Sequence, residues 1–263
     1  MQKKTYLQEC LRNGKIIRWE DSCMPLKVYI SPFRFYSQKD QDYIYRKMAI
    51  DAFNEWERIS CGVVSFQAVD SLLYSQINLE WKRVDRDALG HCVFNMDANN
   101  RLYSAEVQIG ISDGLMHQEY MKKDEVYHTI LHEVGHAVGL GHSTFKNDIM
   151  YTPHQYGITK LSEHDKLTLK WLYKFGINKT PQEIGSEKGV QGSDLDEIVL
   201  KLIQKNNPSE FENVKNSIKN QKKDLLKEQT NIADLKKYNL SLQNISISQD
   251  VLKQLSKPPH KKN

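Results

Sequence analysis

The chain has 263 residues, of which 39% are hydrophobic, 10% aromatic and 27% charged, a composition typical of a globular protein with a core of ordinary density. No apolar run is long enough to cross a bilayer, and the formal net charge of +4 arises in residues 178–263, where 15 lysines accompany 11 acidic residues. Residues 1–177 carry 22 basic and 22 acidic side chains, which cancel. The sequence therefore predicts neither a membrane span nor a nucleic-acid partner.

The amino terminus and the cysteines assign no compartment. Residues 1–19 start with basic residues but contain neither the apolar block nor the cleavage site of a secretory signal. The four cysteines are sparse and have no CxxC spacing, which favours reduced thiols over a disulfide framework or a metal-binding pair. They are Cys10, Cys23, Cys61 and Cys92.

Composition changes near Gly176. All four tryptophans lie before this residue, and the chain after it is rich in Lys, Asn, Gln, Ser and Leu. We therefore predict an N-terminal extension over residues 1–16, a folded domain over 17–176 and a charged segment over 177–263.

Patterns within the folded domain predict strands and helices in mixed order. Residues 40–60 place Ile44, Met48, Ala52, Phe53 and Trp56 on one helical stripe, which suggests a long amphipathic helix packed on a sheet. Apolar alternation predicts strands at 25–30, 63–69, 76–84 and 106–112, and further helices are expected at 124–139 and 162–175. This order indicates an α+β fold.

The segment from His132 to His142 reads HEVGHAVGLGH. On a helix, His132 and His136 differ by only about 40° around the axis, so their imidazoles converge on one ion. The opposite side of the helix is apolar and can pack into the core. That apolar side consists of Val126, Ile130, Val134 and Ala137.

Glu133 and the two glycines complete this pattern. Glu133 projects too far round the helix to bind the same ion, but it can reach a water molecule on it. Gly139 can end the helix with a positive φ, so that His142 returns to the ion, and Gly141 adds freedom. Zinc with three protein ligands keeps a position for water and lowers its pKa to ~7. HExxH alone arises by chance on solvated helices, but HExxHxxGxxH followed by a methionine is much harder to obtain by chance.

The motif HEVGHAVGLGH followed by Met150 resembles the metzincin zinc peptidases, and most closely the matrixins (matrix metalloproteinases, peptidase family M10). Ser143 directly after the last histidine matches the matrixin form, and IMY resembles its Met-turn. The similarity runs from Trp19 to Gly176. It includes KVYI, AFNEWERIS, ALGHCVF and LSEHDKLTLKWLYKFG.

The resemblance implies a zincin-like catalytic domain with a twisted mixed sheet, three helices and a Met-turn. His132, His136 and His142 would bind one catalytic zinc ion, with Glu133 as general base and Met150 as a packing residue beneath the metal. A protein or peptide substrate would add a strand along the edge at Leu89 and Gly90. Pro153 and Tyr156 would correspond to the wall of the pocket after the scissile bond, at a spacing one residue longer than usual.

The chain also departs from the matrixin pattern. Matrixins hold a structural zinc and calcium ions, but only His91 stands at an expected ligand position, Glu106 replaces another histidine, and one ligand of four does not make a site. The family is usually secreted, yet this chain shows no signal. The Arg-Cys-Gly latency segment is missing, so Cys10 or Cys23 is left as a candidate latch on the metal.

The predicted function is that of a zinc metalloendopeptidase. The alternative is a catalytically weak or inactive zinc-binding module whose tail mediates self-association or partner binding. From Asn207 the tail has apolar residues at coiled-coil spacing, which suits a helical arm, but a solvated and partly disordered lysine-rich helix fits the same composition. Intact Glu133 favours the enzyme, because a module that only held zinc would not need the base.

Overall fold

The computed structural model describes residues 4–35, 41–84, 88–112, 120 and 122–206, all of which belong to one compact unit that extends from Met1 to Phe211. None of the helices in these residues is long and apolar enough to span a bilayer. The helical arm expected from Asn207 lies outside the described residues.

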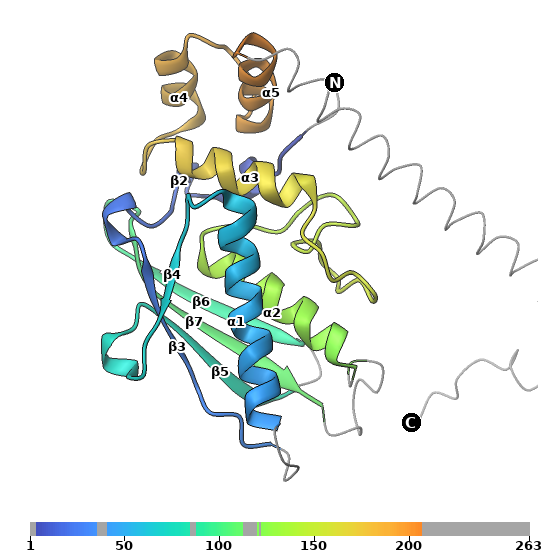
Figure 1. The fold of residues 1–263 in the computed structure, drawn as a ribbon. Coiled ribbons are helices and arrows are strands. Elements are labelled where there is room, and N and C mark those ends of the chain that lie inside the picture. The colour runs from blue at the N-terminus through green and yellow to red at the C-terminus, as the bar shows by residue number, and fades with distance from the viewer. Residues whose placement is uncertain (1–3, 36–40, 85–87, 113–119, 121, 207–263) are drawn as a thin grey trace, which may run out of the picture. The chain divides into compact units, whose positions relative to one another are not determined.

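A five-stranded mixed sheet forms the centre of the fold, with the spatial order β4-β3-β5-β7-β6 (Figure 1). Strands β3, β4, β5 and β7 are parallel, and the edge strand β6 is antiparallel to β7. A separate hairpin joins β1 to β2. The strands are β1 Leu11–Arg12, β2 Lys15–Ile16, β3 Leu26–Ile30, β4 Phe66–Ala68, β5 Ile77–Arg83, β6 Gly90–Met96 and β7 Leu102–Ile111.

Helices α1 and α2 pack on each other and on the sheet, α1 against β4 and α2 against β6 and β7. Helix α3 packs against α1 and against a short 3-10 turn, η1, and α5 packs against α4 and η1. The mixed sheet with helices confirms the predicted α+β class. The helices are α1 Gln41–Ser60, α2 Lys123–Ala137, α3 Glu163–Lys174, α4 Pro181–Lys188 and α5 Leu195–Asn206, and the 3-10 turns are η1 Leu7–Cys10, η2 Asp21–Cys23 and η3 Leu72–Tyr74.

The buried face of α1 lies slightly further round the helix than the sequence predicts. Tyr45 and Ala49 are buried, whereas Ile44 and Met48 are only half-buried. The ring of Tyr45 stacks on Phe33 with centroids 4.1 Å apart and meets Trp81 edge-on at 5.7 Å. These aromatic contacts turn the helix toward Tyr45, because large rings bury more area than Ile44 or Met48.

The N-terminal segment belongs to the folded unit instead of forming an extension. Leu7 N and Thr5 Oγ1 each lie 2.7 Å from Asp196 Oδ1 in α5, and Leu195 N donates to Gln8 Oε1. The composition change at Gly176 therefore falls inside the compact unit, and residues 177–206 form two helices of that unit. Overall composition does not reveal that α5 belongs to the folded unit, because lysines are interspersed with its apolar residues in the sequence. In the fold these apolar residues are buried; they are Leu195, Ile198, Val199, Leu202 and Ile203.

We expect the substitution Asp196→Ala to lower the free energy of unfolding by about 2–3 kcal/mol, because two buried donors lose their acceptor. Urea denaturation followed by circular dichroism measures the change. Asp70→Ala removes an exposed carboxylate in a loop and is the matched control, with an effect within about 0.5 kcal/mol. Equal effects of the two substitutions would show that the link between the N-terminal segment and α5 contributes nothing to stability.

Candidate metal centre

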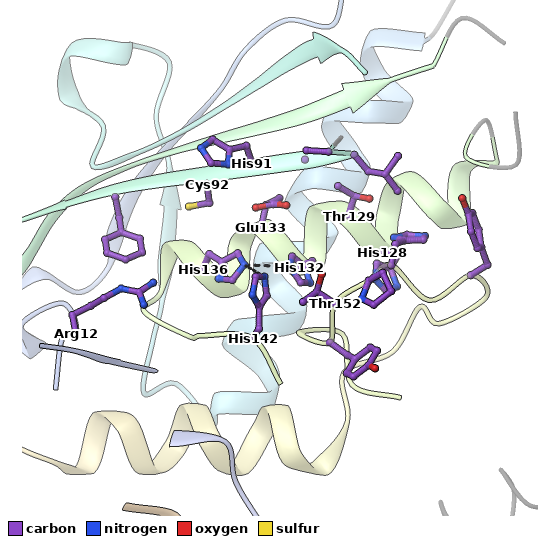
Figure 2. Close-up of a pocket in the computed structure, with 18 residues that line it drawn as sticks. Arg12, His91, Cys92, His128, Thr129, His132, Glu133, His136, His142 and Thr152 are labelled. Carbon is purple, nitrogen blue, oxygen red and sulfur yellow. Dashed lines mark hydrogen bonds between the residues drawn. The ribbon is translucent and has the colours of Figure 1, made fainter. Parts of the chain in front are cut away.

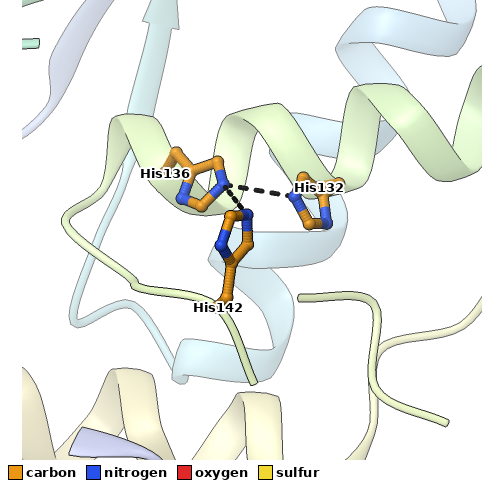
Figure 3. Close-up of side chains that lie close together, drawn as sticks. All are labelled: His132, His136 and His142. Atoms are coloured by element: carbon orange, nitrogen blue, oxygen red, sulfur yellow. Dashed lines mark hydrogen bonds between the residues drawn. The ribbon is translucent and has the colours of Figure 1, made fainter. Parts of the chain in front are cut away.

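Three imidazoles from α2 and the loop after it converge on one point (Figure 3). His136 Nε2 lies 3.2 Å from His132 Nε2 and 3.2 Å from His142 Nε2. One ligand atom from each residue lies within 4.8 Å of the others, and no other such group of three metal-ligating side chains occurs in the described part of the chain. The structure therefore brings together the three histidines that the sequence selected.

Backbone carbonyls set the orientation of two of these rings. His132 Nδ1 lies 2.7 Å from Ile149 O, and His136 Nδ1 lies 2.8 Å from Leu140 O. A carbonyl only accepts, so each Nδ1 carries the proton and each Nε2 directs its lone pair at the shared point. Burial lowers the pKa of His136 to about 4 and that of His132 well below its usual value. Neutral rings with converging lone pairs fit a divalent metal ion.

The turn between His136 and His142 is shaped by two glycines. Gly139 has φ +97° and Leu140 N donates to Gly135 O at 3.0 Å, so the chain leaves the helix in a left-handed conformation. A Cβ atom at Gly141 would lie 2.0 Å from Glu9 O. The N-terminal segment thus passes directly against this turn, and only glycine leaves it enough space.

Met150 packs against α2 behind the histidines. It is fully buried, and a Cβ atom at Gly135 would lie 2.3 Å from its Sδ. Asp165 at the start of α3 accepts a hydrogen bond from Ile149 N at 3.1 Å, and Ile149 O accepts from His132. The turn at Met150 is therefore held by Asp165 of α3, and the same turn orients the ring of His132.

We expect Gly135→Ala to destabilise the protein by about 1–3 kcal/mol, because the added methyl overlaps Met150. The same substitution in a Met150→Ala background should cost less, since the overlapping sulfur atom is gone. Thermal or urea unfolding of the four proteins gives the coupling. If Gly135→Ala destabilised the protein equally in both backgrounds, the added methyl group would overlap an atom other than those of the Met150 side chain.

Glu133 is buried next to the histidines, beneath the edge strand (Figure 2). A Cβ atom at Gly90 in β6 would lie 2.8 Å from Glu133 Oε1, so glycine permits the strand to cross the carboxylate this closely. Burial raises the pKa of Glu133 to about 8. A cation held by the three imidazoles would favour the ionised carboxylate.

These residues open into a cleft of about 610 Å³ between β6 and the loop after Met150 (Figure 2). All four cleft residues predicted from the sequence line it: Leu89, Gly90, Pro153 and Tyr156. Ten further residues line the cleft that were not among the predicted site residues. Two of them, Cys92 and Phe94, share a strand face with Gly90, and His128 precedes His132 by one helical turn, so periodicity contained a signal for these three. No such signal exists for Arg12, which comes from a distant segment, whereas His154 lies between the predicted residues Pro153 and Tyr156.

The end of the cleft near Thr152 is polar. His128 Nδ1 lies 2.6 Å from Ile158 O, and His154 Nε2 lies 2.9 Å from Glu125 Oε2. The two imidazole rings meet with centroids 4.1 Å apart. Glu125 is buried and accepts a second hydrogen bond from Gly157 N at 3.1 Å. Two histidines therefore line this end, and one of them, His154, is hydrogen-bonded to the buried carboxylate of Glu125.

Neither proposed latch cysteine lines the cleft. The thiol of Cys10 is buried and accepts a hydrogen bond from Gly141 N at 3.2 Å, and burial raises its pKa to about 12. A thiol in that environment stays protonated and supports the turn before His142. Cys23 lies half-buried in η2. The cysteine in the cleft is Cys92, whose pKa burial raises well above its usual value.

His91 lies outside the cluster of three histidines: it is exposed, alternates with Cys92 along β6 and lines the cleft without joining the converging imidazoles. Glu106, which the resemblance placed at a second ligand position of a structural zinc site, is also exposed, in register with Val93. The two side chains therefore do not share a register position, since His91 pairs with Gln108.

The matrixin family profile matches residues 30–174, more than half of the chain. The chain belongs to the matrixin family. The matched residues run from the end of β3 to the end of α3 and contain the three histidines, Glu133 and Met150. Matrixin membership implies a zinc metallopeptidase. The β1–β2 hairpin, α4 and α5 lie outside the matched range, and no curated protein matches the chain.

We expect the purified protein to bind one zinc ion per chain, and His142→Ala to weaken zinc binding at least about 100-fold, because it removes one of three ligands. His91→Ala is the matched control, a histidine outside the cluster, and should leave affinity unchanged. Competition with a coloured chelator and elemental analysis provide the measurement. A loss of zinc from the His91→Ala protein would instead indicate a second zinc site.

Proposed function

We propose that this matrixin is an active zinc-dependent endopeptidase that hydrolyses peptide bonds in protein substrates. One observation carries the proposal: a buried carboxylate, Glu133, lies next to three converging neutral imidazoles at the centre of an open cleft. Three histidine ligands leave a coordination position free, which is the arrangement of catalytic zinc sites. A site that served only to hold metal would have no use for an additional buried carboxylate.

Zinc, when bound to His132, His136 and His142, would act as a Lewis acid that polarises the carbonyl group of the substrate and lowers the pKa of a bound water molecule. Glu133 accepts the proton of the attacking water and returns it to the leaving amine, which makes it the general base and then the general acid. Its burial under Gly90 keeps bulk water from the carboxylate. The Nδ1 hydrogen bonds of His132 and His136 hold the rings in place during this transfer.

The edge strand β6 supplies a binding surface for an extended peptide. It pairs with β7 on one side and is the last strand in the sheet order, so its other edge faces the cleft. A substrate can add a strand there through backbone hydrogen bonds, with Leu89 and Gly90 at the contact. Pro153 and Tyr156 form the facing wall, which we assign to the residue after the scissile bond.

We expect Glu133→Ala to reduce the rate of cleavage of an unstructured protein by about 10²–10⁴-fold, because the general base is lost. The zinc content should not change, since Glu133 is not one of the converging ligands. Gel-based cleavage assays at matched zinc occupancy provide the measurement. If the wild type binds zinc and cleaves no substrate, the protein is a metal-binding module and the proposal fails.

A further inference from the structure

The N-terminal hairpin brings a cationic side chain into the cleft from outside the matched family range. Arg12 in β1 pairs with Lys15 in β2 across a turn in which Asn13 and Gly14 have φ of 50° and 73°. Asn-Gly with two positive φ values is the favoured two-residue hairpin turn. Ile16 N donates a hydrogen bond to Lys179 O, and Ile16 O accepts one from Asn178 N, each at 2.9 Å. Arg12 therefore sits on a hairpin that is fixed to the rest of the fold.

The guanidinium of Arg12 lies over the edge strand, with its Cζ 5.6 Å from the ring centroid of Phe94. Both residues line the cleft, and Figure 2 shows Arg12 at the end near His136 and away from His128 and Thr152. The aromatic ring holds the cation without neutralising it.

The described lining of the cleft provides no counterion for this charge. Among the lining residues that the structure describes, Arg12 is the only lysine or arginine, and Glu133 is the only carboxylate. No carboxylate in the described part of the chain forms an ion pair with Arg12. Its planar group retains the donors that recognise a carboxylate in a bidentate manner. A peptide lying along β6 would pass directly by these donors.

We propose that Arg12 is a specificity-determining residue that binds the carboxylate of an aspartate or glutamate in the substrate, N-terminal to the scissile bond. The inference rests on the proposed function. The position follows because Pro153 and Tyr156, assigned to the residue after the bond, line the opposite end of the cleft. Substrates with an acidic residue at one fixed position before the cut are therefore preferred.

The test uses one random ten-residue peptide library in two ways with the zinc-loaded protein. The wild-type chain cleaves the library, and the products are sequenced by mass spectrometry. Separately, immobilised Glu133→Ala protein retains peptides without turning them over. Both measurements are repeated with Arg12→Gln and Arg12→Glu. Lys15→Gln is the matched control, because it removes a charge from the same hairpin at a residue that does not line the cleft.

We expect peptides with Asp or Glu at the fixed position to have a kcat/KM about five- to tenfold above that of matched Asn or Gln peptides, as for a partly exposed ion pair. Arg12→Gln should abolish this preference, Arg12→Glu should shift it to Lys and Arg, and Lys15→Gln should leave it unchanged. Roughly 0.5 M salt should reduce the preference in the wild type by screening.

The two measurements separate the two claims. Acidic peptides retained in an Arg12-dependent manner without any cleavage would overturn the proposed peptidase activity and support the role of Arg12. Cleavage with no acidic preference, or with a preference that persists in Arg12→Gln, would overturn the role of Arg12 and leave the peptidase intact. Failure to retain or cleave any peptide would overturn both.

Discussion

Three imidazole lone pairs can meet at one point only if each ring is prevented from turning away, and much of the structure around the site serves that constraint. The carbonyls of Ile149 and Leu140 accept hydrogen bonds from the Nδ1–H groups of His132 and His136. Ile149 is in turn held by Asp165. The convergence of the rings thus depends on a chain of hydrogen bonds that runs from the start of α3 through the turn at Met150 to α2.

Close packing enforces the same arrangement where hydrogen bonds do not. Gly90 lets β6 cross above Glu133, Gly135 lets Met150 pack beneath α2, and Gly141 lets the N-terminal segment pass the turn before His142. In each case a single Cβ atom would meet another atom at under 3 Å. The three glycines therefore set the distances between the layers of the site, and larger residues would separate them.

The N-terminal segment links the packing of the fold to the lining of the cleft. Its residues are held by Asp196 in α5, its Cys10 supports the turn at Gly141, and its hairpin presents Arg12 at the cleft. Helix α5 and the hairpin both lie outside the matched family range, but they belong to the same compact unit as the metal centre. An addition to the family domain can change specificity in this way without altering the metal ligands.

The sequence alone determined the local part of this protein: the α+β class, the helix that carries His132 and His136, and the return of His142 after Gly139. These features depend on periodicity and turn chemistry over a few residues, which the order of residues encodes directly. Only the tertiary structure decided that residues 4–16 and 177–206 belong to the compact unit, that α1 turns toward Tyr45, and that Arg12 lines the cleft. Each of those features depends on a contact between residues far apart in the chain, such as Leu7 with Asp196, and no periodic pattern within one segment records such a contact.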